Sequence, residues 1–187
     1  MGRDPDDLDV RQGRRAVLRA GALSLLALAV GAPEARAAVR EPRRLRMRHT
    51  HTGERLDVVW DAGALARDAR AEVSRFLRDF RTGDVHPIDP GVLETAWAIA
   101  AAAGRPTAVV EVVSGYRSAR TNALLRERGS GVARHSLHVE GRALDFRMEG
   151  IPTGRVRDLA LALGRGGVGY YAASDFVHVD TGRPRTW

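Results

Sequence analysis

Apolar and polar residues alternate most clearly near position 50. Apolar side chains and His49 alternate with arginines over residues 43–49, residues 51–54 supply a turn, and residues 56–60 resume an extended pattern. A period of two is typical of strands with one buried face, so this segment predicts a β-hairpin. His49 and His51 fall on one side of the pattern, but no carboxylate or third histidine lies near them in the sequence to complete a metal site.

The rest of the chain mixes helical and extended patterns. Apolar residues recur at helical spacing in four segments that end at or near a glycine, which predicts helices over residues 64–81, 92–103, 120–128 and 153–163. Short apolar runs predict strands over residues 107–114, 142–148, 166–171 and 176–180. Composition does not shift after residue 40, so we expect one domain.

The first 37 residues have the pattern of a targeting segment. Arg14 and Arg15 precede an apolar run over residues 20–32, and Ala35-Arg36-Ala37 follows as a small-x-small cleavage site. The pair of arginines resembles a twin-arginine signal, which predicts export of the folded protein. An uncleaved anchor is the alternative, but the apolar run is shorter than the ~20 residues that span a bilayer. We therefore expect residues 1–37 as a signal peptide and residues 38–187 as a single domain, periplasmic or secreted and not inserted in the membrane after cleavage.

Composition narrows the possible partners. The formal net charge is +7, and all basic residues are arginines. An exported basic protein suits an anionic polymer such as the cell wall better than nucleic acid, and the arginines lack the interleaved aromatic residues that single-strand binders use. There is no cysteine, so histidine and carboxylate side chains would have to hold any metal ion.

A histidine and carboxylate pattern near position 140 supplies such ligands. His138 and Asp145 are separated by six residues, and His178 lies in the last predicted strand. If that strand is an antiparallel neighbour of 142–148, Asp145 and His178 face each other, and Gly141 permits a tight approach by His138. Two histidines and a carboxylate form the open zinc site of many hydrolases, with a fourth position free for water.

Together these blocks resemble a known family. They are similar to the peptidase M15 superfamily, the D-Ala-D-Ala peptidase and Hedgehog-like zinc metallopeptidases, and within it to an exported murein endopeptidase branch. The resemblance implies an α+β fold with a small antiparallel sheet flanked by helices. It also implies that His138, Asp145 and His178 bind Zn²⁺ and that Arg117 faces substrate near the metal. The matching blocks are residues 78–90, 114–118, 121–122, 135–145 and 167–187.

The general base is a separate question, because many relatives use a glutamate three residues before the last ligand histidine or a histidine two before it. Those positions hold Asp175 and Phe176 here, and phenylalanine cannot move a proton. Asp175 is therefore the candidate base, with Asp180 and His135 as alternatives that could instead orient a ligand.

Other residues are candidates for the substrate groove. Arg117 would stabilise an oxyanion or bind a substrate carboxylate, because its guanidinium is a planar, fixed cation. Its position directly after a strand and a Gly-Tyr turn favours such a functional role. Tyr116, Asn122 and Ser136 would line the groove, although Ser136 would serve equally as a cap.

The resulting hypothesis is a zinc-dependent peptidase that hydrolyses amide bonds in peptidoglycan stem peptides or their cross-links. The alternatives are a D-Ala-D-Ala-type carboxypeptidase, which needs a pocket for a free carboxylate, and a non-catalytic wall-binding module that keeps zinc for structure.

Overall fold

The computed structural model describes residues 42–187, apart from 62–64, 130–132 and 134. The chain divides into two units, residues 1–38 and residues 39–187, and every described residue belongs to the second. The predicted signal peptide therefore lies outside the described residues. None of the helices that the structure describes is long and apolar enough to cross a membrane.

The described part of the chain contains strands and helices interspersed along its whole length. The strands are β1 (Arg43–His49), β2 (Arg55–Trp60), β3 (Val109–Ser114), β4 (Ala143–Met148), β5 (Gly167–Tyr171), β6 (Phe176–Asp180) and β7 (Arg185–Thr186). The α-helices are α1 (Arg67–Phe76), α2 (Pro90–Ala102), α3 (Ala119–Glu127) and α4 (Thr153–Leu163), with short 3-10 turns η1 (Leu137–Glu140) and η2 (Ala172–Ser174).

The strands form one sheet in the order β2-β1-β3-β4-β6-β5-β7, which confirms the predicted α+β class. The sheet is mixed, however, and the prediction of antiparallel pairing throughout was wrong for two pairs. β1 runs parallel to β3, and β5 runs parallel to β7. A long connection through α1 and α2 precedes β3, so this strand can pair with β1 in either direction. The alternation of apolar and polar residues within a strand does not specify which direction it takes. The two-residue strand β7 is too short to leave a pattern in the sequence.

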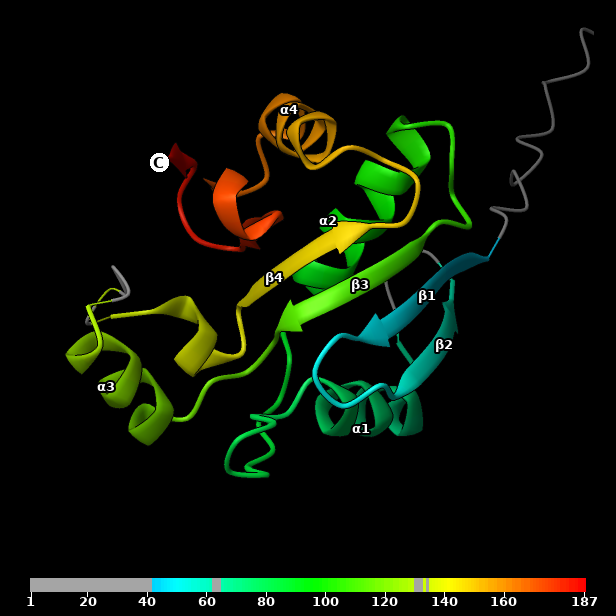
Figure 1. Ribbon diagram of the computed structural model, residues 1–187. Helices are drawn as coiled ribbons and strands as arrows, with labels where there is room; N and C mark the ends of the chain where they lie inside the picture. Colours follow the sequence, from blue (N-terminus) through cyan, green and yellow to red (C-terminus); the bar gives the residue numbers. More distant parts are fainter. Residues whose placement is uncertain (1–41, 62–64, 130–132, 134) are drawn as a thin grey trace, which may run out of the picture. The chain divides into compact units, whose positions relative to one another are not determined.

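Helices α2 and α4 pack against each other and against the same strands (Figure 1). Alternate strand residues point into this layer, among them Met47, Val112 and Phe146, and all three are buried. α2 begins at Pro90, two residues before the predicted start, because Asp89 caps it by accepting a hydrogen bond from the Gly91 N–H at 2.8 Å. The hydrophobic core thus lies between one face of the sheet and helices α2 and α4, and it extends to Val73 and Phe76 of α1.

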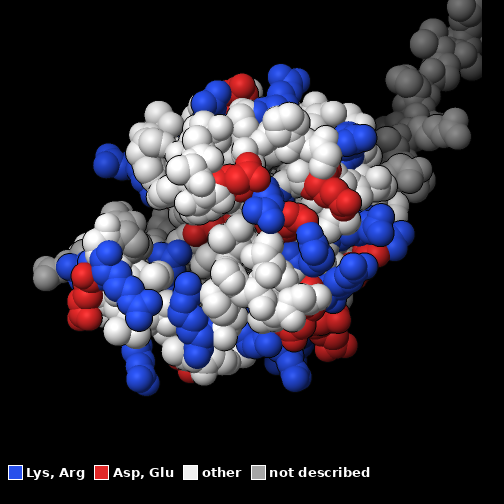
Figure 2. All heavy atoms as spheres, viewed as in Figure 1, with Lys and Arg blue, Asp and Glu red and all other residues white. Residues whose placement is uncertain are grey.

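The other face of the sheet carries charged residues. Arg48, Glu111 and Arg147 lie side by side on β1, β3 and β4, and Glu111 pairs with both arginines. Arginines and acidic residues are interspersed on the surface drawn in Figure 2, without a continuous basic patch. Because strand residues alternate, Asp145 on β4 shares this face with Arg147. We call it the open face.

The predicted helix 64–81 is shorter in the structure, because a turn over residues 77–84 replaces its last part. Asp79, which is buried, organises this turn. One carboxylate oxygen accepts the Arg81 N–H at 2.9 Å, and the other accepts the N–H and hydroxyl of Ser118 at 2.9 and 2.7 Å. A side chain that competes in this way for backbone donors ends the helix and attaches the turn to the start of α3.

These hydrogen bonds predict a pH-dependent stability. Burial alone would raise the pKa of Asp79, but the donated hydrogen bonds outweigh it and lower the pKa to about 2. A carboxyl with a depressed pKa stabilises the fold above its unfolded pKa near 4, and this stability disappears as pH falls toward 2. We expect Asp79→Asn to lower the free energy of unfolding by about 2 kcal/mol at pH 6 and by much less at pH 2.5. Denaturant unfolding of both proteins at the two pH values measures this, and an equal difference at both would contradict it.

Candidate metal centre

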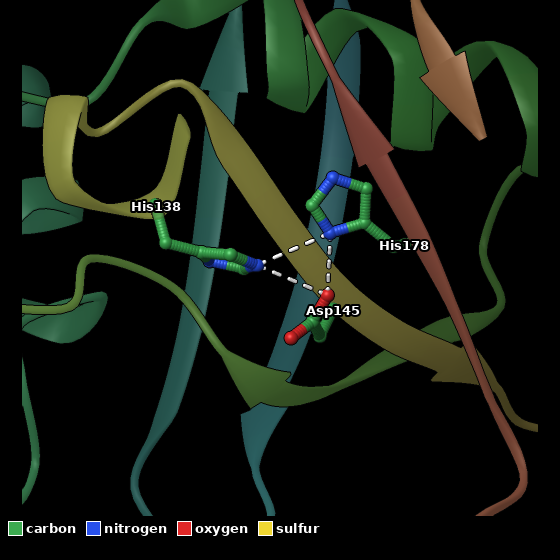
Figure 3. A group of neighbouring side chains, drawn as sticks. All are labelled: His138, Asp145 and His178. Carbon is green, nitrogen blue, oxygen red and sulfur yellow. Dashed lines mark hydrogen bonds and ion pairs between the residues drawn. The ribbon is translucent and has the colours of Figure 1, made fainter. Parts of the chain in front are cut away.

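Three side chains from three elements meet on the open face (Figure 3). Asp145 on β4 stands opposite His178 on β6 in the antiparallel pair, as the sequence predicted. His138 comes from η1, just before β4. This turn ends at Gly141 with φ 67°, where a Cβ would overlap the carbonyl oxygen of Pro87. Only glycine fits there, so the turn can bring His138 over the sheet.

The three facing atoms are close together. His138 Nε2 lies 3.1 Å from both His178 Nδ1 and Asp145 Oδ1, and these two atoms lie 2.8 Å apart. Ligand atoms around a tetrahedral zinc ion with bonds of about 2.0–2.1 Å are roughly 3.3 Å apart. Among the described residues this is the one group of three such side chains that could hold a metal ion.

The outer nitrogens of both rings already have partners. His138 Nδ1 lies 2.7 Å from the carbonyl oxygen of Gly115, and His178 Nε2 lies 3.0 Å from Asp180 Oδ2. A carbonyl or carboxylate oxygen only accepts, so each outer nitrogen carries the proton and each inner nitrogen of a neutral ring presents a lone pair. Two nitrogen lone pairs and a carboxylate oxygen therefore face one point. Such a group repels itself unless a proton or cation lies between its members, and histidine held by a carboxylate or carbonyl is the usual arrangement of a metal ligand.

The pKa shifts of the three side chains agree with a proton or cation lying between them. Burial alone would raise the pKa of Asp145, but the two histidines hold it well below its usual range. Burial lowers the pKa of His138. His178 is also buried, yet Asp145 and Asp180 raise its pKa to about 9 when no metal is bound. A proton then occupies the shared point at neutral pH, and a metal ion must displace it, so metal binding should strengthen as pH rises toward 9.

Arg117 lies beside this cluster. Its backbone N–H donates to the carbonyl oxygen of His138 at 3.1 Å, and its Nη2 lies 3.4 Å from both Asp145 Oδ2 and Ser114 Oγ. The residue is 8% exposed, and its Nε has no hydrogen-bond partner in the part of the chain that the structure describes. The resemblance led us to expect that Arg117 faces substrate near a metal, and the structure places it beside the three candidate ligands.

A cleft of about 400 Å³ opens over the cluster, and the three side chains and Arg117 line it. Two further groups come to it from distant parts of the chain. One is His51 and Arg81, from the first hairpin and the turn 77–84. The other is an aromatic wall, defined as Tyr171, Phe176 and Trp187.

Comparison with known proteins shows to which family this chain belongs. Residues 37–187 match the family model described as peptidoglycan L,D-endopeptidase MepK. The chain belongs to this family. The probable peptidoglycan L,D-endopeptidase MepK of Haemophilus influenzae is 39% identical over 180 residues, which cover 95% of this chain and 97% of that protein. Peptidoglycan L,D-endopeptidase MepK of Escherichia coli K12 is 38% identical over 176 residues, covering 93% and 96%. No solved structure gives a significant match.

The match confirms the resemblance to the peptidase M15 superfamily. It also covers the full length of β4, η1 and β6, which carry the three candidate ligands. A MepK family member with these side chains in a cleft has the donor set that a divalent metal peptidase needs.

The candidate base Asp175 is not brought to the cluster. Its Oδ1 accepts a hydrogen bond from the Thr153 hydroxyl at 2.6 Å, at the start of α4, and it does not line the cleft. Its neighbours Ser174 and Phe176 both do. Asp175 has φ 50°, a left-handed conformation at the junction of η2 and β6, and this turns its side chain away from theirs.

The other candidates are placed as follows. His135 and Ser136 line the cleft, and Ser136 makes no side-chain cap for η1. Tyr116 stacks on His86 with ring centroids 4.8 Å apart and does not line it, and Asn122 donates to the Ala133 carbonyl at 3.3 Å, also away from the metal ligands. Ser136 therefore lies in the cleft, whereas Tyr116 and Asn122 are not part of its lining; Asn122 lines a neighbouring pocket together with His135 and Ser136.

Sequence patterns missed the aromatic wall. Trp187 packs over Gly169, where any Cβ would collide with the indole, and its ring centroid lies 5.1 Å from that of His178. Its Nε1–H donates to the Tyr171 hydroxyl at 2.9 Å. Gly169 is the sequence feature that could have indicated the aromatic wall. It lies directly opposite His178 in the sheet, and because glycine has no side chain it leaves room for a large ring over the site.

Asp180 should tune the metal affinity. Its carboxylate accepts from His178 and also from the N–H groups of Gly167 and Gly182 and from Arg185. We expect Asp180→Asn to weaken zinc binding about tenfold or more, because the amide orients His178 but no longer increases its basicity. Competition with a chromophoric chelator measures the affinity. Asp158→Asn, on the exposed side of α4, is the control, and equal affinities of the two variants would contradict the role.

Proposed function

We propose that this protein is an exported, zinc-dependent endopeptidase that hydrolyses amide bonds in the peptide cross-links of peptidoglycan. The observation that carries the proposal is the convergence of three ligand atoms, from His138, Asp145 and His178, in the lining of one cleft. Curated relatives that align over nearly their whole length are named as peptidoglycan L,D-endopeptidases, which supports this substrate class.

His138, Asp145 and His178 would hold the metal ion, and their mixture of imidazole and carboxylate suits zinc. When bound, zinc supplies Lewis acidity that lowers the pKa of a water nucleophile toward ~7 and polarises the substrate carbonyl. Gly115 and Asp180 keep the two rings in the tautomers that present a lone pair, so the protein contributes a prearranged site.

Arg117 would stabilise the negative charge that develops on the carbonyl oxygen. It is a fixed cation in a largely buried position beside the ligands, where an electrostatic interaction is stronger than in water. Its backbone N–H donates to the carbonyl oxygen of His138, and Asp79 holds the next residue, Ser118, so the backbone that carries Arg117 is fixed on both sides.

Asp175 remains our proposal for the group that takes the proton of the attacking water. It lies three residues before His178, its two neighbours line the cleft, and within the described residues Thr153 is the one side-chain partner of its exposed carboxylate. Proton transfer would require this carboxylate to leave Thr153, and hydrogen bonds to a catalytic base are often formed only with substrate present.

Two variants separate this role from a structural one. If Asp175 is the base, Asp175→Asn lowers kcat about 100-fold or more with zinc retained, whereas Thr153→Ala keeps kcat within about threefold. If Asp175 only anchors η2 to α4, the two variants lose the same contact and behave alike. Steady-state kinetics with zinc analysis measures both, and a matching His135→Gln variant shows whether the base is His135 instead.

Export remains part of the proposal. The twin-arginine-like leader of residues 1–37 and the net charge of +7 support delivery to an anionic wall outside the cytoplasm. A fusion of these residues to a reporter that functions only after folded export tests the route, and Arg14→Lys with Arg15→Lys should abolish export.

The position of the cleaved bond tests the proposed activity directly. Incubation of cross-linked muropeptides with the zinc-loaded protein, followed by mass spectrometry, should show cross-links converted to two shorter peptides. Release of only a terminal amino acid would identify a carboxypeptidase instead. Zinc binding without any cleavage would favour the non-catalytic wall-binding module.

A further inference from the structure

The turn 77–84 carries a cation to the same cleft from a distant part of the chain. Arg81 lines the cleft together with the metal ligands, although 57 positions separate it from His138 in the sequence. Its backbone N–H is held by the buried carboxylate of Asp79. The same carboxylate holds Ser118, the residue after Arg117. One buried group therefore sets the backbone positions of two cleft arginines.

The side chain of Arg81 is also arranged by its neighbours. Its guanidinium carbon lies 4.1 Å from the centroid of the Phe80 ring, and Phe80 stacks on His51, with centroids 4.2 Å apart and planes within 13°. His51 lines the cleft as well. A guanidinium that rests on an aromatic ring loses less freedom when it binds an anion, because part of its motion is already restricted.

The cleft arginines differ in their partners. Arg185 pairs with Asp180 at 2.6 Å, and Arg117 lies 3.4 Å from Asp145. Arg81 makes no ion pair and no side-chain hydrogen bond among the described residues. Burial and the nearby charges of Arg117 and Arg128 lower its pKa, with Asp79 acting in the opposite direction. Of the three cleft arginines, Arg185 is neutralised by Asp180 and Arg117 lies beside Asp145, so the charge of Arg81 is the one that no carboxylate among the described residues pairs with.

We propose that Arg81 binds a free carboxylate of the peptide that occupies the cleft. A planar guanidinium with all its donors free binds a carboxylate in the bidentate manner that favours this group over a neutral amide. Arg117 acts at the reacting carbonyl, and Arg81 acts beyond it as a specificity-determining residue. This inference rests on the proposed function, because it assigns the peptide substrate of that reaction to the cleft.

The experiment compares a stem peptide with the same peptide whose carboxylates are converted to carboxamides. Calorimetry measures the binding of each peptide to the zinc-loaded protein. Hydrolysis is measured as kcat/KM on two cross-linked substrates, one made from the carboxylate form and one from the carboxamide form. We expect the wild type to prefer the carboxylate form, and Arg81→Gln to reduce this preference roughly tenfold, the size of one lost charge-assisted hydrogen bond. The loss should be in KM and Kd, with kcat on the carboxamide substrate nearly unchanged.

Arg120→Gln is the matched control. Arg120 is also an exposed arginine, on the first turn of α3, but it does not line the cleft, so this variant removes the same net charge elsewhere. An unaltered preference in Arg81→Gln, or an equal reduction in both variants, overturns the inference even if the cross-links are cleaved. If the wild type cleaves neither cross-link, the proposed function fails, and the binding measurements still decide whether Arg81 recognises a carboxylate.

Discussion

Replacing His178 with alanine is expected to abolish zinc binding and peptide hydrolysis together. Among the described residues, three candidate ligands face the proposed metal position, and the variant would leave two, with the ionised carboxylates of Asp145 and Asp180 facing the gap. We expect kcat/KM to fall at least about 1,000-fold, since the metal contributes several kcal/mol of transition-state stabilisation and each 1.36 kcal/mol is tenfold in rate. Zinc content per protein should fall with it.

His138→Ala should have the same effect, and the double variant should be no worse than either single one, because ligands of one ion act as a unit. Circular dichroism of the variants and of the chelator-treated wild type shows whether the fold is kept. A His178→Ala protein that retains stoichiometric zinc and hydrolyses cross-links would show that these ligands are wrongly assigned.

The second large effect is expected for Arg117→Ala. Loss of one oxyanion-stabilising group lowers kcat about 100- to 1,000-fold, and the zinc content should be retained because Arg117 is not a ligand. Arg117→Lys should recover only part of the rate, since an ammonium group lacks the planar fork. Steady-state kinetics with metal analysis distinguishes the roles. A rise in KM with unchanged kcat would contradict oxyanion stabilisation and would indicate substrate binding alone.

The sequence was sufficient to predict that His138, Asp145 and His178 come together, because their positions depend on local patterns. Alternation places Asp145 and His178 on definite faces of their strands, and an antiparallel register then brings them opposite each other. His138 follows from Gly141, whose left-handed conformation no other residue adopts as readily. The helices and most strands were predicted for the same reason, with differences of a few residues at their ends.

The rest of the cleft depends on contacts that no local pattern contains. Arg81 reaches it only because Asp79 ends the helix early and attaches the turn 77–84 to α3. Trp187 reaches it through the parallel strand β7, which is two residues long. Spacing from His178 predicted the position of Asp175, but the backbone conformation there directs its carboxylate toward Thr153. Side-chain direction in a tight turn depends on φ and ψ, which residue spacing does not give.

The central claim is that the cluster of His138, Asp145 and His178 binds the zinc ion that drives cleavage of peptidoglycan cross-links. The most direct test is hydrolysis of cross-linked muropeptides by the purified protein before chelation, after removal of the metal, and after one equivalent of zinc is restored. The account predicts that the untreated protein cleaves the cross-links, that the metal-free protein does not, and that added zinc restores cleavage. Added zinc should not restore cleavage in the His178→Ala variant. Cleavage that persists after complete metal removal would contradict it.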